Sequence, residues 1–430
     1  MAPLVSPKWL TKPSQFLISS LSFLVFIFLD FLDFLFCIYF YYIDGFLEGK
    51  SSPCYCKTGN EDKKSENEVS ETLYRRKNVF RKMRFVRKYE NLQENENGVL
   101  GNRWSDCGCE SCVAWMMNAH HRLFVAVSEA SQASLENVHA KPAEDVLFLH
   151  GFLSSSEFWT RSIFPEFSEF VRDNYRLFAV DLLGFGRSPK PRACLYTLRD
   201  HLEMIEESVI CPFQLKSFHL VAHSMGCVLA LALAAKYPDT VKSVTLVAPP
   251  YFPSSDIDAG TKALERLAGK SLWPPILFGS AVMTWYEHLG RCVCFFICRN
   301  HRAWEKILKL FTHKRDLLQT IENVTQHTHH SAWHTMHNVI CGGAKYMDGY
   351  LETIRKSGVK ICVIQGSRDQ VVPLECSNNI KTKVLDADVR VIANADHGSV
   401  ILGRSQDFAR DLESIWASTA DTTVQVAGFC

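Results

Sequence analysis

Short apolar runs alternate with longer amphipathic stretches along most of the chain after about residue 112. Apolar runs without polar alternation are typical of strands that are buried on both faces of a parallel sheet. Helical stretches, among them 196–209 and 225–238, separate several of these runs. The alternation predicts the α/β class, with a doubly wound and mostly parallel sheet. The predicted strands are 122–130, 146–150, 176–182, 218–224, 243–249, 360–366 and 389–395.

The first part of the chain holds one long apolar stretch, 16–46. It is long enough to cross a bilayer, although Asp30 and Asp33 interrupt it and would be costly at mid-membrane. No good small-residue cleavage site of the signal-peptide kind accompanies it. We therefore expect residues 1–46 to form a membrane-targeting or anchor segment, with a core helix as the alternative. Its orientation stays open because lysines stand on both sides.

Polar and basic residues dominate the next part, 47–111, which we expect to be a linker. Within it, the stretch 75–88 holds eight basic residues in fourteen, with apolar residues between them. Two interpretations fit this pattern: a helix that binds a membrane surface or a partner, and an exposed basic stretch of the linker.

Sixteen cysteines are many for a cytosolic enzyme. Cys54 and Cys56, followed by Cys107, Cys109 and Cys112, stand close together, but their spacing does not match the paired C-x2-C pattern of common zinc sites. Disulfides in a lumenal or extracellular setting, or acylated thiols beside the apolar stretch, fit better. Cys54 and Cys56 are therefore candidates for lipidation, and we expect neither a metal nor a cofactor.

A serine follows the fourth predicted strand directly, in the tetrapeptide H-S-M-G at 223–226. A serine at a tight turn from strand to helix is held with its Oγ exposed, and the residues two before and two after it must be small. Gly226 meets this need, and Ala222 stands where the G-x-S-x-G pattern has glycine. The context of strand and helix predicts Ser224 as a nucleophile.

An acid and a histidine follow in the chain order that such a nucleophile requires. Asp369 lies in the loop after strand 360–366, and His397 lies after strand 389–395. We expect His397 to take the proton of Ser224 and Asp369 to fix the tautomer of the imidazole. Asp396 is the alternative acid, disfavoured because neighbours along a loop point apart.

The loop after strand 146–150 is expected to supply an oxyanion hole. The backbone N–H of Phe152 would lie across from that of Met225, and two such donors stabilise a developing oxyanion. We expect His150 and Gly151 to support this loop, with His150 as an organiser rather than a proton carrier. The glycine-rich stretch 181–188 is expected to be a structural turn, because it lacks the lysine of a phosphate-binding loop.

A long insertion separates the two halves of the predicted core. We expect a first half at 112–249, a helical cap at 250–359, a second half at 360–417 and a tail at 418–430. The sequon at Asn323 is a candidate glycosylation site in this cap. Its aromatic residues could line an acyl pocket or only fix the cap to the core. Five histidines crowd one cap segment, but a metal is not expected there: His327, His329, His330, His334 and His337.

Taken together, these motifs resemble the α/β-hydrolase superfamily over about residues 112–417. The runs EDVLFLHGFLSSSEFWT, LFAVDLLGFGRSPKP and FHLVAHSMGCVLALALA are similar to the plant BODYGUARD group, described as probable lysophospholipases. The apolar N-terminal stretch followed by Cys-x-Cys is similar too. This resemblance implies a membrane- or wall-associated hydrolase that acts in cuticle (cutin) formation, facing the extracellular side, with the endoplasmic reticulum membrane as the alternative.

The expected activity is that of a serine esterase or lipase that cleaves acyl esters of lipids through an acyl-enzyme. An acyltransferase or polyester synthase with the same triad is one alternative, and a non-catalytic binding protein on a hydrolase fold is another. The net charge of +1 gives no electrostatic reason to expect a nucleic acid as partner. The expected partners are a lipid substrate and a membrane, and the sequence does not indicate the oligomeric state.

Overall fold

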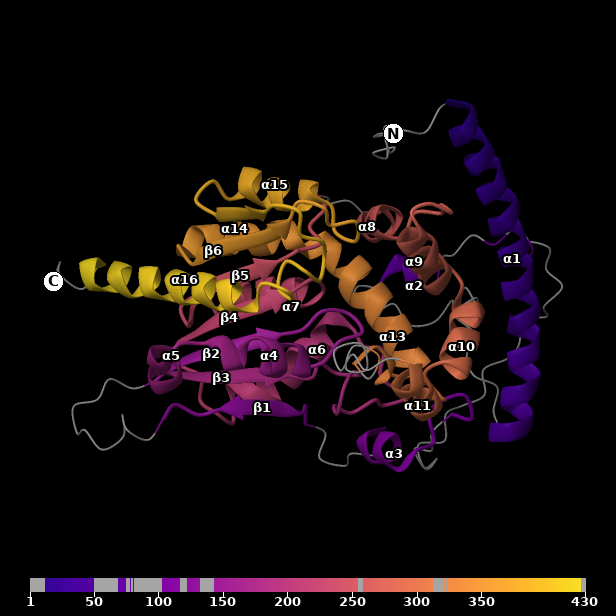
Figure 1. Ribbon diagram of the computed structural model, residues 1–430, viewed down its shortest axis with the longest axis horizontal. Helices are drawn as coiled ribbons and strands as arrows, with labels where there is room; N and C mark the ends of the chain where they lie inside the picture. The colour runs from indigo at the N-terminus through magenta and orange to yellow at the C-terminus, as the bar shows by residue number, and fades with distance from the viewer. Residues whose placement is uncertain are drawn as a thin grey trace.

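The computed structural model describes residues 12–49, 69–74, 78, 80, 103–116, 122–131, 143–253, 258–311, 321 and 323–426. Within them, a central sheet is covered by helices on both faces, and a group of further helices lies between this core and one long N-terminal helix (Figure 1).

The sheet has seven strands in the order β1-β3-β2-β4-β5-β6-β7. All pairs are parallel except β1 with β3, which is antiparallel. Each strand overlaps one of the predicted runs, so the predicted α/β class and the mostly parallel sheet are confirmed. The strands are β1 (Val125–Ser128), β2 (Glu144–Leu149), β3 (Tyr175–Val180), β4 (Phe218–His223), β5 (Val241–Val247), β6 (Lys360–Gly366) and β7 (Asp388–Ile392).

Alternate side chains of each central strand enter two separate cores. In β2, Leu147 and Leu149 belong to one core, and Val146 and Phe148 belong to the other. Because both faces are covered, these strands are apolar at almost every position, which is the pattern read from the sequence. The first core includes α6 (Leu198–Ile205), α7 (Gly226–Lys236), α14 (Met347–Ser357) and α15 (Leu374–Lys383). The second includes α4 (Glu157–Ser162), α5 (Glu169–Asn174) and α16 (Ser405–Val426).

The insertion after β5 is helical, as expected for a cap. Within it, α13 continues into a π-helical turn over Met336–Cys341 that packs in the first core, and the insertion ends with α14, which belongs to the same core. At the other end of the chain, α16 extends past residue 417 to Val426 as one helix. The cap helices are α8 (Ala259–Leu267), α9 (Pro275–Trp285), α10 (Glu287–Phe296), α11 (His301–Phe311) and α13 (His329–Thr335).

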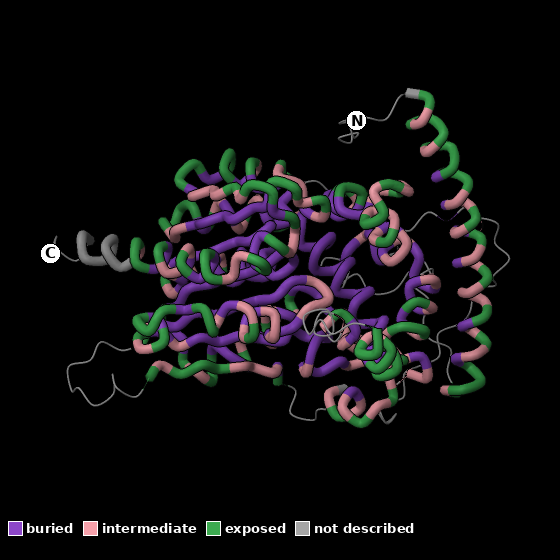
Figure 2. The backbone as a smooth tube through the Cα atoms, viewed as in Figure 1, coloured by how far each residue is buried: buried purple, intermediate pink, exposed green. Residues whose placement is uncertain are grey.

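Helix α1 (Lys12–Glu48) stands beside the cap at the edge of the molecule (Figure 1). By length and composition it could cross a membrane. It presents one buried stripe to the cap, while its remaining residues are exposed or intermediate (Figure 2). The stripe repeats every three to four residues, which places its members on one helix face. Its buried residues are Ser22, Phe26, Asp30, Asp33, Phe40 and Asp44.

Two short helices precede the core: α2 (Glu71–Tyr74) and α3 (Glu110–Met116). The segment 103–116, which includes α3, packs against α1 and the cap. Trp104 donates from Nε1 to Asp44 of α1, and its ring lies 5.2 Å from that of Phe295 in α10. Part of the predicted linker is therefore held against both elements.

Candidate active site

Ser224 lies at the sharp turn between β4 and α7. Its φ is +50°, a left-handed conformation that is rare outside glycine and that recurs at functional turns. The N–H of Ser224 donates to Val247 O at 2.8 Å, which fixes the turn to β5. A Cβ on Gly226 would lie 2.7 Å from His150 O and 2.8 Å from Leu149 O, so only glycine lets the helix start this close to β2.

The loops after β6 and β7 bring an acid and a histidine together. His397 Nδ1 lies 2.8 Å from Asp369 Oδ2. The Asp369 side chain is fully buried, and its Oδ1 accepts from the N–H groups of Val371 and Val372 at 2.8 Å each. These donors leave the second carboxylate oxygen directed at the imidazole. Since β4, β6 and β7 are parallel, all three loops meet at the carboxyl edge of the sheet.

Asp396 is engaged elsewhere. Its Oδ1 accepts from the N–H groups of Gly398 and Ser399 at 3.0 and 2.7 Å, and hydrogen bonding to Ser399 lowers the pKa of this carboxyl. Asp396 thus closes the turn that carries His397. Of the two carboxylates considered, the structure pairs only Asp369 with the imidazole. Among the described residues, no hydrogen bond joins Ser224 to His397, a contact that often forms only when substrate is bound.

The loop after β2 lies against the serine. A Cβ on Gly151 would lie 3.2 Å from Ser224 Cβ, so this backbone borders the nucleophile position. Leu182 N–H donates to His150 Nε2 at 2.9 Å, and His150 Nδ1 lies 2.7 Å from Gly151 O. Nε2 therefore accepts and Nδ1 donates, which makes this imidazole neutral. Burial also lowers the pKa of His150. These contacts fit the expected organiser of the loop that carries Phe152.

The glycine-rich stretch 181–188 forms a tight turn. Asp181 accepts from the N–H groups of Ser156 and Arg187 at 2.6 and 2.7 Å. Gly186 has a φ of +53°, and a Cβ there would lie 2.2 Å from the Asp181 carboxylate. These contacts tie the turn to the loop after β2 and give it a structural role.

Comparisons with known proteins agree with this fold. A family model described as alpha/beta hydrolase fold matches residues 146–289. The chain is 52% identical over 414 residues to probable lysophospholipase BODYGUARD 4 of Arabidopsis thaliana, which covers 93% of this chain and 97% of that one. It is 49% identical over 409 residues to probable lysophospholipase BODYGUARD 5 of the same plant, covering 89% and 91%.

The chain belongs to the BODYGUARD family of α/β hydrolases. Probable lysophospholipase BODYGUARD 2 of Arabidopsis thaliana, at 38% identity, covers 95% of this chain and 99% of its own length. The similarity to the BODYGUARD relatives therefore includes the cap and the C-terminal half, beyond the matched residues 146–289. The enzyme class that accompanies this membership is a carboxylester hydrolase.

One residue of this BODYGUARD site received no role from the sequence. His223 Nε2 lies 3.1 Å from His397 O, and the two rings are 4.8 Å apart. Burial lowers the pKa of His223 to about 3, so it stays neutral and donates to this carbonyl. Phe158 stacks on the His223 ring, with the ring centres 5.2 Å apart. His223 thus holds the backbone of the loop that carries His397. The only sign of this role in the sequence is the position of His223 directly before Ser224.

Three of the five cap histidines make contacts that link neighbouring segments. His330 Nε2 lies 2.9 Å from Cys194 O, His334 Nδ1 lies 3.1 Å from Leu195 O, and His337 Nδ1 lies 2.8 Å from Thr72 Oγ1. They fix α13 and the turn after it to neighbouring segments. The aromatic residues proposed for an acyl pocket contact α1 or lie exposed in several cases: Phe278 and Tyr286 pack on Phe26, and Phe296 and Phe311 are exposed.

Of the candidate modification sites, the structure describes only Asn323. Asn323 is half-buried, and its Oδ1 accepts from Ser155 Oγ at 2.8 Å. Thr325 of the same sequon is buried and donates to Ile321 O. Cys54 and Cys56 lie outside the described residues, as does most of the basic stretch 75–88.

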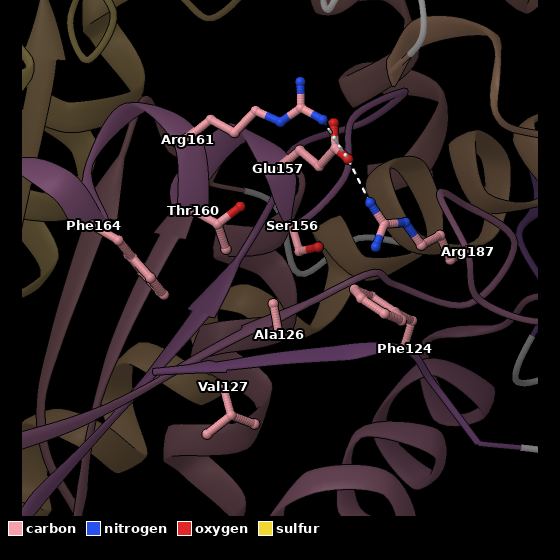
Figure 3. Close-up of a pocket in the computed structure, with 9 residues that line it drawn as sticks. All are labelled: Phe124, Ala126, Val127, Ser156, Glu157, Thr160, Arg161, Phe164 and Arg187. Carbon is pink, nitrogen blue, oxygen red and sulfur yellow. Dashed lines mark hydrogen bonds and ion pairs between the residues drawn. The ribbon is translucent and has the colours of Figure 1, made fainter. Parts of the chain in front are cut away.

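One open cavity of about 330 Å³ lies beside β1 and α4 (Figure 3). Glu157 extends between Arg161 and Arg187 there, at 3.1 and 2.6 Å, and so neutralises part of their charge. Its lining includes none of Ser224, Asp369 and His397. This cavity is therefore separate from the candidate catalytic residues.

Proposed function

We propose that this chain is a serine esterase or lipase that cleaves acyl esters of lipids. The observation that carries the proposal is the contact of 2.8 Å between His397 and buried Asp369, at the sheet edge where Ser224 stands in a left-handed turn. In this assignment Ser224 is the nucleophile, His397 the general base and Asp369 the group that orients it.

The reaction proceeds through an acyl-enzyme. His397 takes the proton of Ser224 as Oγ forms a bond to the ester carbonyl carbon. The same proton then passes to the alkoxide oxygen as the bond to the leaving alcohol breaks. A water molecule repeats the sequence: His397 takes its proton, the hydroxide attacks the acyl-enzyme, and Ser224 leaves with the proton restored. Asp369 stabilises the imidazolium in both halves.

The N–H groups of Phe152 and Met225 are the proposed oxyanion donors. Gly151 supports this assignment because its backbone approaches Ser224 without a side chain between them. His150 holds the loop in place through Leu182 and Gly151. Donors fixed before the reaction need no reorganisation as charge develops, so they stabilise the oxyanion by several kcal/mol in comparable sites.

Lysophospholipids are the first substrate class to test, because the curated relatives are named probable lysophospholipases. The resemblance to the BODYGUARD group also supports a role in cuticle formation. Transfer of the acyl group to an alcohol instead of water, as in polyester synthesis, is the second candidate reaction, since the same triad forms the same acyl-enzyme. Ligand binding without turnover is the third.

A substrate panel distinguishes these activities. The full chain in detergent would be incubated with lysophospholipids, acylglycerols and hydroxy-fatty-acid esters, with and without an added alcohol, beside Ser224→Ala as the control. We expect fatty acid release from lysophospholipid that disappears in the variant. An ester of the added alcohol as the main product would favour acyl transfer. Binding of an ester without any product would favour a non-catalytic binding protein.

Helix α1 supports a proposal for membrane attachment. Its acidic residues are engaged with the cap: Asp33 Oδ1 accepts from the N–H of His288 at 2.9 Å, and Asp44 binds Arg291 through both oxygens at 2.7 and 2.8 Å. The polar stripe is therefore satisfied by protein. The exposed face is apolar, including Phe16, Leu17, Leu21, Phe23, Leu24, Phe28, Phe31 and Leu35.

From this division we propose that α1 lies along a membrane surface with the cap beside it and its exposed face in the lipid. The contacts of α1 with the rest of the protein extend from Ser22, which accepts from Leu272 N–H in the cap, to Glu48, which pairs with Arg192 in the core segment before α6. A helix that crossed the bilayer in this arrangement would bring polar cap residues to membrane depth, which is costly. We place the hydrolase domain on the extracellular side of the cell membrane, with the endoplasmic reticulum membrane as the alternative.

A further inference from the structure

Three cysteines before the core meet one histidine of the cap. Cys107, Cys109 and Cys112 lie in and beside α3, and His301 begins α11 almost two hundred residues later. One ligand atom from each of the four residues lies within 4.8 Å of all the others. Cys112 and His301 are buried, while Cys107 and Cys109 are half-buried.

The distances in this cluster match the edges of a zinc tetrahedron. His301 Nε2 lies 3.5 Å from Cys109 Sγ and 3.4 Å from Cys112 Sγ. Zinc–sulfur and zinc–nitrogen bonds of about 2.3 and 2.05 Å at a tetrahedral angle place N and S about 3.6 Å apart. The observed separations therefore leave room for an ion between the ligand atoms.

The second nitrogen of the histidine is oriented as metal binding requires. His301 Nδ1 lies 2.8 Å from Oε1 of Glu305, a carboxylate that is itself buried. A carboxylate accepts, so Nδ1 carries the proton and Nε2 presents its lone pair to the sulfur atoms. This carboxylate–histidine pair is the usual outer support of a zinc ligand. A disulfide among the cysteines would not use the histidine, so it would not explain why His301 is oriented in this way.

We propose that Cys107, Cys109, Cys112 and His301 bind one structural zinc ion. The set Cys3His is one of the common closed ligand sets, in which four protein ligands leave no position for substrate. None of the described cysteines is paired in a disulfide. The spacing of the three cysteines alone disfavoured zinc, because the fourth ligand lies almost two hundred residues further along the chain and only the fold brings it near.

A neighbouring group does not complete such a set. Cys294 and Cys298 lie 3.6 and 3.7 Å from His327 Nε2. A closed tetrahedral site needs a fourth ligand, and among the described residues this group offers three. Because this second group lies near the Cys3His site and holds the same residue types, the experiment must identify which zinc ion is lost and not only the total zinc per chain.

The zinc would fasten the segment 103–116 to the cap. This segment already contacts both α1 and α10: Arg291 Nε donates to Ser105 Oγ at 3.0 Å while its guanidinium binds Asp44. Arg302 of α11 donates to Ser111 at 3.2 Å. A metal at the α3–α11 contact would hold α1, the segment and the cap as one unit, remote from the chemistry at Ser224.

Metal analysis of the full chain tests the proposal. Zinc per chain would be measured by inductively coupled plasma mass spectrometry for the wild type, for Cys107→Ser/Cys109→Ser, and for the matched control Cys211→Ser, which changes an exposed cysteine. We expect the double variant to lose one zinc per chain and to have a lower Tm. The control should keep both values. Fluorophosphonate labelling of Ser224 would report whether the double variant remains folded.

Alkylation of the wild type keeps the test decisive if the double variant does not fold. We expect Cys107, Cys109 and Cys112 to react with iodoacetamide only after zinc is removed by a chelator. A disulfide among these three cysteines, equal reactivity before and after chelation, or unchanged zinc in the folded double variant would overturn the proposal. The proposal would also be overturned if the wild type held a single zinc ion and the Cys298→Ser change removed it.

Discussion

At the residue scale, the candidate site depends on an acid, Asp369, that several fixed donors hold in place. Asp369 receives two backbone N–H groups on one oxygen, and Gln365 Nε2 donates to the other at 3.1 Å. Gln365 is itself fixed by Ser377, which donates to its Oε1 at 2.9 Å. A carboxylate surrounded in this way cannot turn from the imidazole, so it can orient His397 without moving.

The first prediction concerns the nucleophile. Ser224→Ala removes a hydroxyl that makes no hydrogen bond among the described residues, so we expect a folded protein with a Tm close to that of the wild type. Fluorophosphonate labelling should be lost completely, because the change removes the proposed nucleophile. Ser357→Ala, at the far end of α14, is the control and should label normally. Residual labelling of Ser224→Ala would mean that another serine is the nucleophile.

The second prediction compares the two carboxylates. Asp369→Asn should lower kcat by about 10⁴-fold, by analogy with the same change in a serine protease triad, because the amide cannot hold the required tautomer. Asp396→Asn should have a much smaller effect, since Asp396 only closes a turn. Initial rates on a short-chain ester, with Tm as the check on folding, measure both. The reverse ranking would assign the acid to Asp396.

At the element scale, the start of α7 is set by how closely it approaches β2. The backbone of Gly226 fits against two carbonyl groups of Leu149 and His150, and neither can move without shifting the strand or the loop that carries the proposed oxyanion donor. The geometry of one helix start therefore affects both the proposed nucleophile and the proposed oxyanion hole.

The third prediction uses this contact. Gly226→Ala should lower the free energy of unfolding by about 1–3 kcal/mol, the usual cost of forcing an extra carbon into a packed interior, and should lower kcat as well. Gly349→Ala is the matched control, because Gly349 lies exposed in α14 with open space around it. That change should raise stability by about 0.5–1 kcal/mol through helix propensity. Equal effects of the two changes in denaturant titrations would contradict the packing argument.

The fourth prediction concerns pH and the amino end of β2. Hydrogen bonds from His219 first, and from Lys242, lower the pKa of Glu144 from 4.5 to about 2. Burial lowers the pKa of His219, so the neutral imidazole donates to Glu144 at 3.2 Å. A lowered carboxyl pKa stabilises the fold above pH 4.5, and this contribution is lost as the pH falls towards about 2.

Unfolding experiments across this pH range measure that contribution. Glu144→Gln should be less stable than the wild type at neutral pH, and the difference should shrink as the pH falls from 4.5 towards 2. Glu352→Gln is the control, because Glu352 forms exposed ion pairs that contribute little. A difference that does not change with pH would show that the charge of Glu144 is not responsible.

At the scale of the whole molecule, α1 and the cap form one side and the sheet forms the other (Figure 1). The buried stripe of α1 faces the protein (Figure 2), and the large residues exposed on its other side are apolar. A free spanning helix would gain nothing from a buried stripe that carries Asp33 and Asp44. This division is what favours a helix that lies along the membrane.

The fifth prediction tests this topology. Intact microsomes carrying the full chain with an N-terminal epitope tag would be treated with protease. We expect both the tag and the hydrolase domain to be protected, which places both ends of α1 in the lumen. A digested tag with a protected domain would show a spanning helix instead. Digestion of both would keep α1 in the plane of the membrane but would put the domain in the cytosol.

A glycan at Asn323 would give an independent report of the lumen. We expect a glycosidase-sensitive mass shift that is absent in Asn323→Gln. Since Asn323 Oδ1 accepts from Ser155 in the folded protein, the Asn323→Gln variant should also be checked for Tm. A glycosidase-sensitive shift that persists in the variant would exclude Asn323 as its source.

The sequence by itself determined the sheet, the tight turn that carries Ser224 and the contact between Asp369 and His397. These features are local: an apolar run of a few residues defines a buried strand, and a serine between such a run and a helix defines the turn. Chain order then indicated Asp369 and His397, because parallel strands bring their carboxyl ends to one edge. The family resemblance was also confirmed, because it rests on whole motifs that are local in the sequence.

Only the tertiary structure decided which distant residues meet. His301 joins Cys107, Cys109 and Cys112, Arg291 neutralises Asp44, and His223 holds the loop of His397; none of these contacts follows from spacing. In the sequence, Asp30 and Asp33 interrupt an apolar stretch, because hydropathy does not take into account which face of a helix a residue occupies. In the structure, both lie on the buried face of α1. A contact between residues far apart in sequence depends on how whole elements pack, and local patterns carry no information about that packing.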